Sequence, residues 1–385
     1  MTDVIVARAT TPFDAPFWLK NRHVQTLTGA LPLWSPPRSF DVGAAERWRI
    51  PLAGGGALLA HAHVHEAGGG SDGGPPPVKR TTAIVVHGVG GNSESRCVIR
   101  AAASLHREGL NVIRLNLRGA GESVEDAPSL YHAGLTDDLR AAIDAACADG
   151  RVSDVLVVGF SLGGSASLKL AGEWGDAFPD RVRGIAAISP PFDLVEVSRW
   201  LEKRRSFPYR RYVLQGLVAQ GVEFARRHPD LARYDAAALP RLTSIRAYDD
   251  RVIAPMHGFA SAEDYYRTQS SGGFLAKIRV PAVIVHALDD PMVPERTIRP
   301  WLARIPAHVD VALSQHGGHV GWFGGIAESH FVDTWAMRHV KAFLAKTGRT
   351  ERRDPRIAGA PAPRAAAAQL STDVADLTDR KEGAA

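Results

Sequence analysis

The chain has 385 residues, of which 45% are hydrophobic and 23% charged, and its formal net charge is only +5. These values exclude a mostly disordered chain, and so mild a basicity does not by itself indicate a nucleic-acid-binding protein. Only two cysteines are present, Cys97 and Cys147, which excludes a disulfide-stabilised scaffold and a cysteine-rich metal module.

The beginning of the chain shows no pattern for secretion. Its apolar run covers only residues 4–7, whereas a secretory signal needs roughly 7–15 apolar residues. Further along, no uninterrupted apolar run approaches the roughly 18 residues that span a bilayer. We therefore expect a soluble, cytoplasmic protein.

The first 80 residues predict an extension, a strand pair and a loop. Residues 1–45 are rich in Pro and Trp without a clear period, and we expect them to pack on the core as an N-terminal extension. Residues 47–52 and 57–65 predict two strands around a glycine turn. The Gly- and Pro-rich segment 67–77 suits neither helix nor strand, so we expect a loop there.

From residue 82 onwards, strand-like and helix-like segments alternate. Strands are predicted at 82–87, 111–117, 155–160, 184–189, 280–287 and 309–314. Helices are predicted at 94–108, 135–148, 162–174, 294–303 and 328–345. The strands are nearly continuous runs of Val, Ile, Ala and Leu, as expected where helices cover both faces of a sheet. The alternation therefore predicts an α/β fold with a mostly parallel central sheet and flanking helices.

The predicted domain organisation follows from one long interval between strands. About 90 residues separate the strands at 184–189 and 280–287, far more than a single crossover needs. We assign residues 191–275 to an inserted helical cap, and 46–190 together with 276–346 to the core. Residues 350–385 are rich in Ala, Arg and Pro, and they predict a disordered tail.

The strongest chemical signal is the sequence Gly159-Phe160-Ser161-Leu162-Gly163, which follows an apolar strand and opens a helix. In that context, G-x-S-x-G is typical of a nucleophile elbow, a tight turn that exposes the serine oxygen. Small residues must flank the serine because the turn brings their Cα atoms against neighbouring backbone. The alternative is a glycine-rich turn without chemistry. We take Ser161 as the candidate nucleophile.

A serine nucleophile needs a base, and the base needs an orienting acid. Asp289 and Asp290 stand side by side just past a predicted strand. We choose Asp290, because hydrolase loops of the form G-x-x-D-x-x-V-P place the acid at the fourth position, and we take Asp289 as a turn residue that caps its own loop. After the last strand we choose His319 as the base, since His316 lies too near the strand end. Serine, acid and histidine then follow one another in the expected chain order.

The negative oxygen that forms during acyl transfer needs two backbone N–H donors. We expect one from Leu162, directly after the serine, and the other from Val89 in the loop 87–92. A phosphate-binding role for this loop is a poor alternative, because the loop lacks the Lys-Ser/Thr ending of a P-loop. Ser93 also stands where a dinucleotide-binding loop has its third glycine.

Three histidines, His61, His63 and His65, alternate along one predicted strand and therefore share a face. Such a face can bind a metal ion, but the neighbouring sequence offers no acidic or cysteine partner. We interpret the segment as a solvent-facing strand. We expect neither a metal nor an organic cofactor.

With these motifs the chain resembles the YheT-like branch of the α/β-hydrolases, also called the type 4 α/β-hydrolase family, over roughly residues 13–345. The matching strings are 17–27 (FWLKNRHVQTL), 87–95, 114–119, 132–139, 159–164, 188–194, Ser261-Ala262 with Tyr265-Tyr266, and 317–321. The resemblance implies the α/β-hydrolase fold and a serine hydrolase acting on carboxylic esters, with lipid-like acyl esters as the usual substrates. The triad of the family corresponds to Ser161, Asp290 and His319.

Two other functions remain open at this point. An acyltransferase on the same fold would pass the acyl group to an alcohol or thiol instead of water. A non-catalytic binding protein of this fold is less favoured, because all three members of the candidate triad are present. As partners we expect a small-molecule ester or a lipid, and no nucleic acid.

The segment 196–227 carries eight basic and three acidic residues, with aromatic residues interleaved. A lid of this composition could contact an anionic membrane. The simpler interpretation, which we favour, is an exposed helix whose apolar face covers the core.

Overall fold

The computed structural model describes residues 12–30, 44–65, 78–325 and 327–349. One compact unit ends at Thr347, and the remaining unit, Gly348–Ala385, lies almost entirely outside the described residues. The loop predicted at 67–77 and the tail predicted at 350–385 also lie outside them.

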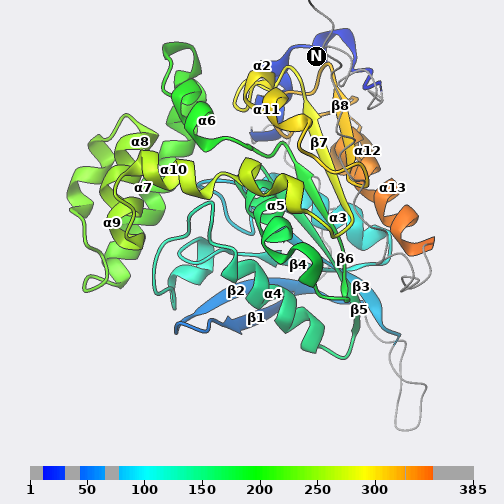
Figure 1. The fold of residues 1–385 in the computed structure, drawn as a ribbon, viewed down its shortest axis with the longest axis horizontal. Coiled ribbons are helices and arrows are strands. Elements are labelled where there is room, and N and C mark those ends of the chain that lie inside the picture. Colours follow the sequence, from blue (N-terminus) through cyan, green and yellow to red (C-terminus); the bar gives the residue numbers. More distant parts are fainter. Residues whose placement is uncertain (1–11, 31–43, 66–77, 326, 350–385) are drawn as a thin grey trace, which may run out of the picture. The chain divides into compact units, whose positions relative to one another are not determined.

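Eight strands form one sheet in the order β1-β2-β4-β3-β5-β6-β7-β8 (Figure 1). Two antiparallel pairings, β1 with β2 and β2 with β4, lie at one edge, and the other neighbours are parallel. The strands are β1 (Glu46–Pro51), β2 (Ala57–His63), β3 (Arg80–Val86), β4 (Asn111–Leu115), β5 (Val152–Phe160), β6 (Val182–Ile188), β7 (Ala282–Ala287) and β8 (Asp310–Ser314). The predicted α/β fold with a mostly parallel sheet is confirmed.

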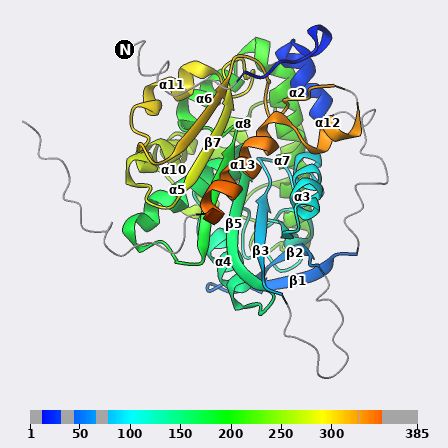
Figure 2. The same cartoon turned by 90° about the vertical axis from the view of Figure 1, so that its right-hand side faces the viewer.

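Helices cover both faces of the sheet, which explains the uninterrupted apolar strands. Alternate strand residues point to opposite faces. Ala83 and Val85 of β3 pack with α3 (Arg96–Arg107) and α13 (Trp335–Arg349), which Figure 2 shows in front of the sheet. Ile84 and Val86 belong instead to the larger core cluster, with α4 (Asp137–Ala148) and α5 (Leu162–Trp174). Shorter elements are η4 (Gly121–Val124), η5 (Gly175–Ala177) and α11 (Glu295–Leu302).

The segment between β6 and β7 consists of helices joined by short loops, as expected for a helical insertion before the strand that precedes Asp290. Its elements are α6 (Leu194–Leu201), η6 (Arg204–Ser206), α7 (Phe207–Arg227), η7 (Ala236–Arg241), α8 (Ile245–Tyr248), a π-helical turn (Asp249–Ile253), α9 (Ala254–His257), α10 (Ala262–Gln269) and η9 (Ser271–Lys277). The long helix α7 buries Val213, Leu217 and Phe224 in the same apolar cluster as the sheet. The segment therefore shares the core of the protein and has no separate one.

Two segments differ in secondary structure from the sequence-based expectations. The extension forms η1 (Phe17–Leu19) and a regular helix, α2 (Arg22–Ala30). The helix expected at 328–345 is broken into α12 (Glu328–Val332) and α13. Asp333 leaves the helical conformation at φ −107° and ψ 58°, and the Thr334 hydroxyl then accepts a hydrogen bond from the amide of Met337, as a helix N-cap does.

The expectation of a solvent-facing histidine strand is wrong. β2 is an interior strand, and His63 on it is only 3% exposed and accepts a hydrogen bond from the Arg114 side chain. α3 covers this face, since His106 stacks on His65 with ring centres 3.9 Å apart. In the part of the chain that the structure describes, no group of three or more His, Cys, Asp and Glu side chains is arranged to hold a metal ion.

Candidate active site

Ser161 occupies the turn between β5 and α5 with a backbone that L-residues rarely adopt, at φ 50° and ψ −116°. Its amide donates a hydrogen bond of 2.8 Å to the carbonyl of Ile188 on β6, which holds the strained turn against the sheet. The flanking glycines are required by space. A Cβ atom on Gly159 would lie 2.4 Å from the carbonyl oxygen of Gly163, and one on Gly163 would lie 2.5 Å from that of His87.

The structure brings the three predicted triad residues together. His319 Nε2 lies 3.0 Å from Ser161 Oγ, and His319 Nδ1 lies 2.7 Å from Asp290 Oδ2. Asp290 is 1% exposed, and its other oxygen accepts hydrogen bonds of 2.8 Å from the amides of Met292 and Val293. The carboxylate of Asp290 is thus fixed by backbone donors. In this position it can accept a hydrogen bond from a protonated Nδ1 of His319, which leaves the unprotonated Nε2 facing the serine.

Contacts from three directions hold the loop that carries His319. The amide of Gly318 donates to Asp289, the amide of His319 donates to the Thr26 hydroxyl on α2, and the amide of Val320 donates to the Ser189 hydroxyl. Asp289 therefore does not simply cap its own turn, as we expected from sequence. Its carboxylate reaches across to the histidine loop, where His316 also lies within 3.4 Å of it.

The two expected N–H donors lie beside the serine. Gly88 to Gly91 form a turn closed by a hydrogen bond of 3.1 Å, with Gly90 at φ 69°. Val89 is the second residue of this turn, whose N–H the turn itself does not use. Leu162 is the first residue of α5, where N–H groups have no partner within the helix. Both residues line one pocket together with Ser161.

A buried histidine anchors the start of the Val89 loop. Burial lowers the pKa of His87 to about 4, so its ring is neutral. Its Nε2 accepts from the amide of Leu117, and its Nδ1 donates to the carbonyl of Gly88. The hydroxyl of Tyr131 accepts a further hydrogen bond of 2.7 Å from the amide of Gly90. Nothing in the sequence around Tyr131 indicated this contact.

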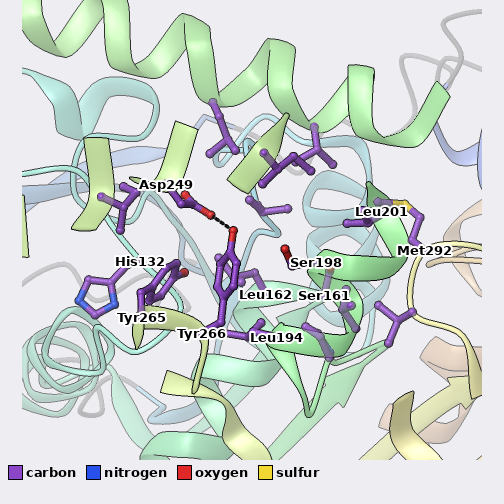
Figure 3. Close-up of a pocket in the computed structure, with 18 of the residues that line it drawn as sticks. His132, Ser161, Leu162, Leu194, Ser198, Leu201, Asp249, Tyr265, Tyr266 and Met292 are labelled. Atoms are coloured by element: carbon purple, nitrogen blue, oxygen red, sulfur yellow. Dashed lines mark hydrogen bonds between the residues drawn. The ribbon is translucent and has the colours of Figure 1, made fainter. Parts of the chain in front are cut away.

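Two pockets share Ser161 and His319 in their walls. Figure 3 shows the apolar one, with Ser161 in its lining. One has a volume of about 730 Å³ including its mouth, and its walls are mostly apolar, with Leu194, Val197 and Leu217 among them. The other is larger, about 1700 Å³, and it is lined by charged residues as well as apolar ones. The reacting centre therefore has an apolar space on one side and a wider, more polar space on the other.

Polar side chains to which the sequence analysis gave no role lie in the wall of the apolar pocket. Asp249 accepts a hydrogen bond of 2.5 Å from the Tyr266 hydroxyl, and burial raises the pKa of Asp249 to about 7. Burial also lowers the pKa of His132 to about 2, and its ring accepts a hydrogen bond from the amide of Gly134. Asp249 lies in a helical segment with several acidic residues, so no pattern distinguished it.

Known proteins resemble this chain in sequence. A family described as the alpha/beta hydrolase fold matches residues 83–325. The YheT protein of Escherichia coli, described as a candidate esterase, is 31% identical over 242 residues, which cover 63% of this chain and 70% of that protein. The monoacylglycerol lipase ABHD2 of Homo sapiens is 27% identical over 255 residues, covering 63% and 60%. A monoacylglycerol lipase of Saccharomyces cerevisiae is 28% identical, covering 62% and 54%. The matched region thus spans less than two thirds of either lipase.

Solved structures resemble this one in fold. An esterase of Pyrococcus furiosus superposes with a TM-score of 0.51 at 15% identity, covering 88% of this chain and 99% of that one. The α/β-hydrolase GrgF of Penicillium sp. sh18 superposes with a TM-score of 0.52 at 16% identity, covering 79% and 99%. At such low identity, these similarities concern the fold alone.

Proposed function

The chain belongs to the α/β-hydrolase family, in its YheT-like branch, and from this premise we propose that it hydrolyses carboxylic esters, with acyl or lipid-like esters as substrates. Its similarity to esterases and lipases supports ester hydrolysis in general. The observation that carries the proposal is the chain of contacts from Ser161 through His319 to the buried Asp290, at 3.0 and 2.7 Å. The Ser161 end of this series of contacts lies in the wall of an apolar pocket.

In the proposed mechanism His319 takes the proton of Ser161, whose oxygen attacks the ester carbonyl. Asp290 keeps the imidazole in the required tautomer and stabilises its cationic form. The N–H groups of Val89 and Leu162 bind the negative oxygen, and the N-terminus of α5 adds a favourable field. His319 then protonates the departing alcohol and leaves an acyl-serine. Water attacks this intermediate with His319 again as base, which releases the acid and restores Ser161.

The two pockets suggest how the substrate lies. The apolar pocket would hold the acyl chain, because burying each CH₂ group stabilises the complex by about 0.8 kcal/mol. The wider pocket would hold the alcohol part, since charged residues such as Glu94 line it. Product analysis with and without an added alcohol separates hydrolysis from transfer to that alcohol.

The surface around the wider pocket supports a substrate drawn from a lipid surface, and we include this in the proposal. Leu27 and Tyr212 are exposed and line that pocket. Other exposed apolar side chains on η1, α2 and α7 are Phe17, Trp18, Val24 and Phe207. The basic segment 196–227 lies next to them in α6 and α7. Apolar and basic side chains together favour an anionic membrane surface.

Flotation with phosphatidylcholine vesicles, with and without phosphatidylserine, tests this membrane contact. We expect binding that requires the anionic lipid and weakens as salt rises. Absence of salt-sensitive binding would contradict the contact. No helix among the described residues is long and apolar enough to cross a bilayer.

A fluorophosphonate probe tests the function itself. It should label the wild-type protein and fail to label Ser161→Ala, and this variant should lose ester hydrolysis by a factor on the order of 10⁶. The control is Ser165→Ala, one turn further along α5, where the hydroxyl contacts Ser271 and not His319. Wild-type esterase activity in Ser161→Ala would refute the assignment.

A further inference from the structure

A buried carboxyl group that the mechanism does not use lies in the wall of the apolar pocket. Asp249 is 6% exposed, and one of its oxygens, Oδ2, accepts the hydrogen bond from Tyr266. Ser198 lines the same pocket and is also buried. In Figure 3, Asp249 and Ser161 lie on opposite sides of the pocket, with Tyr266 and Ser198 between them. This group is therefore placed along the path of a bound acyl chain and away from the reacting carbonyl.

No side chain or amide of the described residues donates a hydrogen bond to the second oxygen of Asp249, Oδ1. Within the described residues, Tyr266 is the one group that donates a hydrogen bond to this side chain. The neighbouring carboxylates supply no donor to Asp249, because they are themselves hydrogen-bond acceptors: Asp250 accepts from the amide of Ala262, and Glu202 accepts from the amide of Ile245. Although the residue as a whole is buried, this second oxygen is not among the buried polar atoms that lack a partner, so it keeps access to the pocket that the side chain lines. A ligand group in the pocket can therefore supply the missing hydrogen bond.

The backbone holds Asp249 in an unusual way. It begins the π-helical turn Asp249–Ile253 between α8 and α9, and such single turns occur often at functional sites. The start of α8 is fixed by Ser244, whose hydroxyl accepts from the amide of Ala247 and donates to Glu202. The carboxyl group is thus carried by a braced element and directed to the pocket.

We propose that Asp249, Tyr266 and Ser198 form a polar subsite that binds a hydroxyl group on the acyl chain of the substrate. The inference rests on the proposed function, because it names the substrate class of the same site: esters of hydroxylated acyl groups. A hydroxyl group on the substrate suits the second oxygen of Asp249, because a hydroxyl can donate to a carboxylate or accept from a protonated carboxyl group. The Ser198 hydroxyl, in the same pocket, can form a second hydrogen bond with this substrate hydroxyl.

Other polar groups suit this subsite less well. A ketone only accepts hydrogen bonds, so it gains nothing from an ionised carboxylate. An ammonium group brings a full charge into a pocket whose other walls are mostly apolar, at a high desolvation cost. Burial raises the pKa of Asp249 to about 7, so both protonation states are populated near neutral pH, and a hydroxyl group can bind to either.

Nitrophenyl esters test the proposal directly. Each hydroxyalkanoyl ester, with the hydroxyl moved stepwise along the chain, is compared with its unsubstituted parent and with the corresponding amino and keto esters. We expect one hydroxyl position to raise kcat/KM by about 10- to 100-fold over the parent. The proposal is overturned if no position is preferred, or if the amino or keto ester is the better substrate.

The double variant Asp249→Leu/Tyr266→Phe removes both partners of the buried hydrogen bond while keeping side-chain bulk, which avoids leaving one of them unpaired. We expect the hydroxyl-to-parent ratio to fall to about one, with fluorophosphonate labelling reporting that the site is still folded. Met292→Leu, which alters an apolar wall of the same pocket, is the control and should keep the ratio. A ratio that survives in the double variant overturns the proposal.

A binding measurement separates this inference from the proposed function. In Ser161→Ala, a free hydroxyalkanoic acid should raise the melting temperature more than its parent acid does, and the difference should vanish when Asp249→Leu/Tyr266→Phe is added. If the difference appears but no ester is hydrolysed by the wild type, the subsite stands and the hydrolase function fails. If esters are hydrolysed without any hydroxyl preference in rate or binding, the subsite fails alone.

Discussion

The buried Asp249 makes stability depend on pH in a defined direction. Burial raises the pKa of its carboxyl from an ordinary 3.8 to about 7 in the folded protein. Between these values the unfolded chain has lost a proton that the folded chain retains. Unfolding therefore becomes easier as pH rises from about 4 to about 7, and the effect then levels off. At 1.36 kcal/mol per unit, the carboxyl costs the folded state about 4 kcal/mol at high pH.

Replacing Asp249 by Asn removes this dependence, because an amide stays neutral and its oxygen can still accept from Tyr266. Urea unfolding of the wild type and Asp249→Asn at about pH 5 and pH 8.5 measures the effect. We expect the unfolding free energy of the variant, relative to wild type, to increase by about 3 kcal/mol between the two pH values. Asp176→Asn, at a side chain that is 92% exposed, controls for the loss of a surface charge. An equal difference at both pH values would refute the reasoning.

Two further predictions concern the frame of the candidate site. Thr26→Val removes the hydroxyl that accepts a hydrogen bond from the His319 amide, so kcat should fall by about 10-fold or more. Thr26→Ser keeps the hydroxyl and should stay near the wild-type rate. Equal rates for the two variants would exclude the positioning role of Thr26. Gly163→Ala forces a Cβ atom against the carbonyl oxygens of His87 and Val86, at and just beyond the end of β3, and should lower the unfolding free energy by at least about 1–3 kcal/mol. Gly54→Ala, with open space around it, should change the unfolding free energy by less than about 0.5 kcal/mol in a denaturant titration.

Much of the fold and of the candidate site could be predicted because both depend on strand ends. Continuous apolar strands indicate where the sheet lies, and the glycine spacing around Ser161 indicates the turn at a strand end that exposes the serine hydroxyl. The parallel order of the sheet then brings the residues after β5, β7 and β8 to one edge. Asp290 and His319 were identifiable for this reason, although 29 positions separate them.

The helix α2 could not be predicted because its buried face is polar. Gln25 is 0% exposed, and its side chain bonds to the backbone of Leu19 and Phe323, while Val24 and Leu27 on the same helix face outwards. Hydrophobic periodicity finds helices that bury apolar side chains, and this helix is held by hydrogen bonds instead. Asp249 escaped notice for a related reason, since its burial depends on contacts between segments distant in sequence.

The short helix α2 touches two parts of the protein at once. Within one helical turn, the Thr26 hydroxyl accepts a hydrogen bond from the amide of His319, and His23 Nδ1 lies 2.5 Å from the hydroxyl of Tyr209 on α7. Burial raises the pKa of Tyr209 to about 12, so this hydroxyl stays protonated across the physiological range. The helix α2 is therefore held both by Tyr209, in the wall of the wider pocket, and by the loop that carries His319. We therefore expect that loosening either contact weakens the other, so that a change in the wall of the wider pocket also shifts the position of His319, through a segment that contributes no reacting atom.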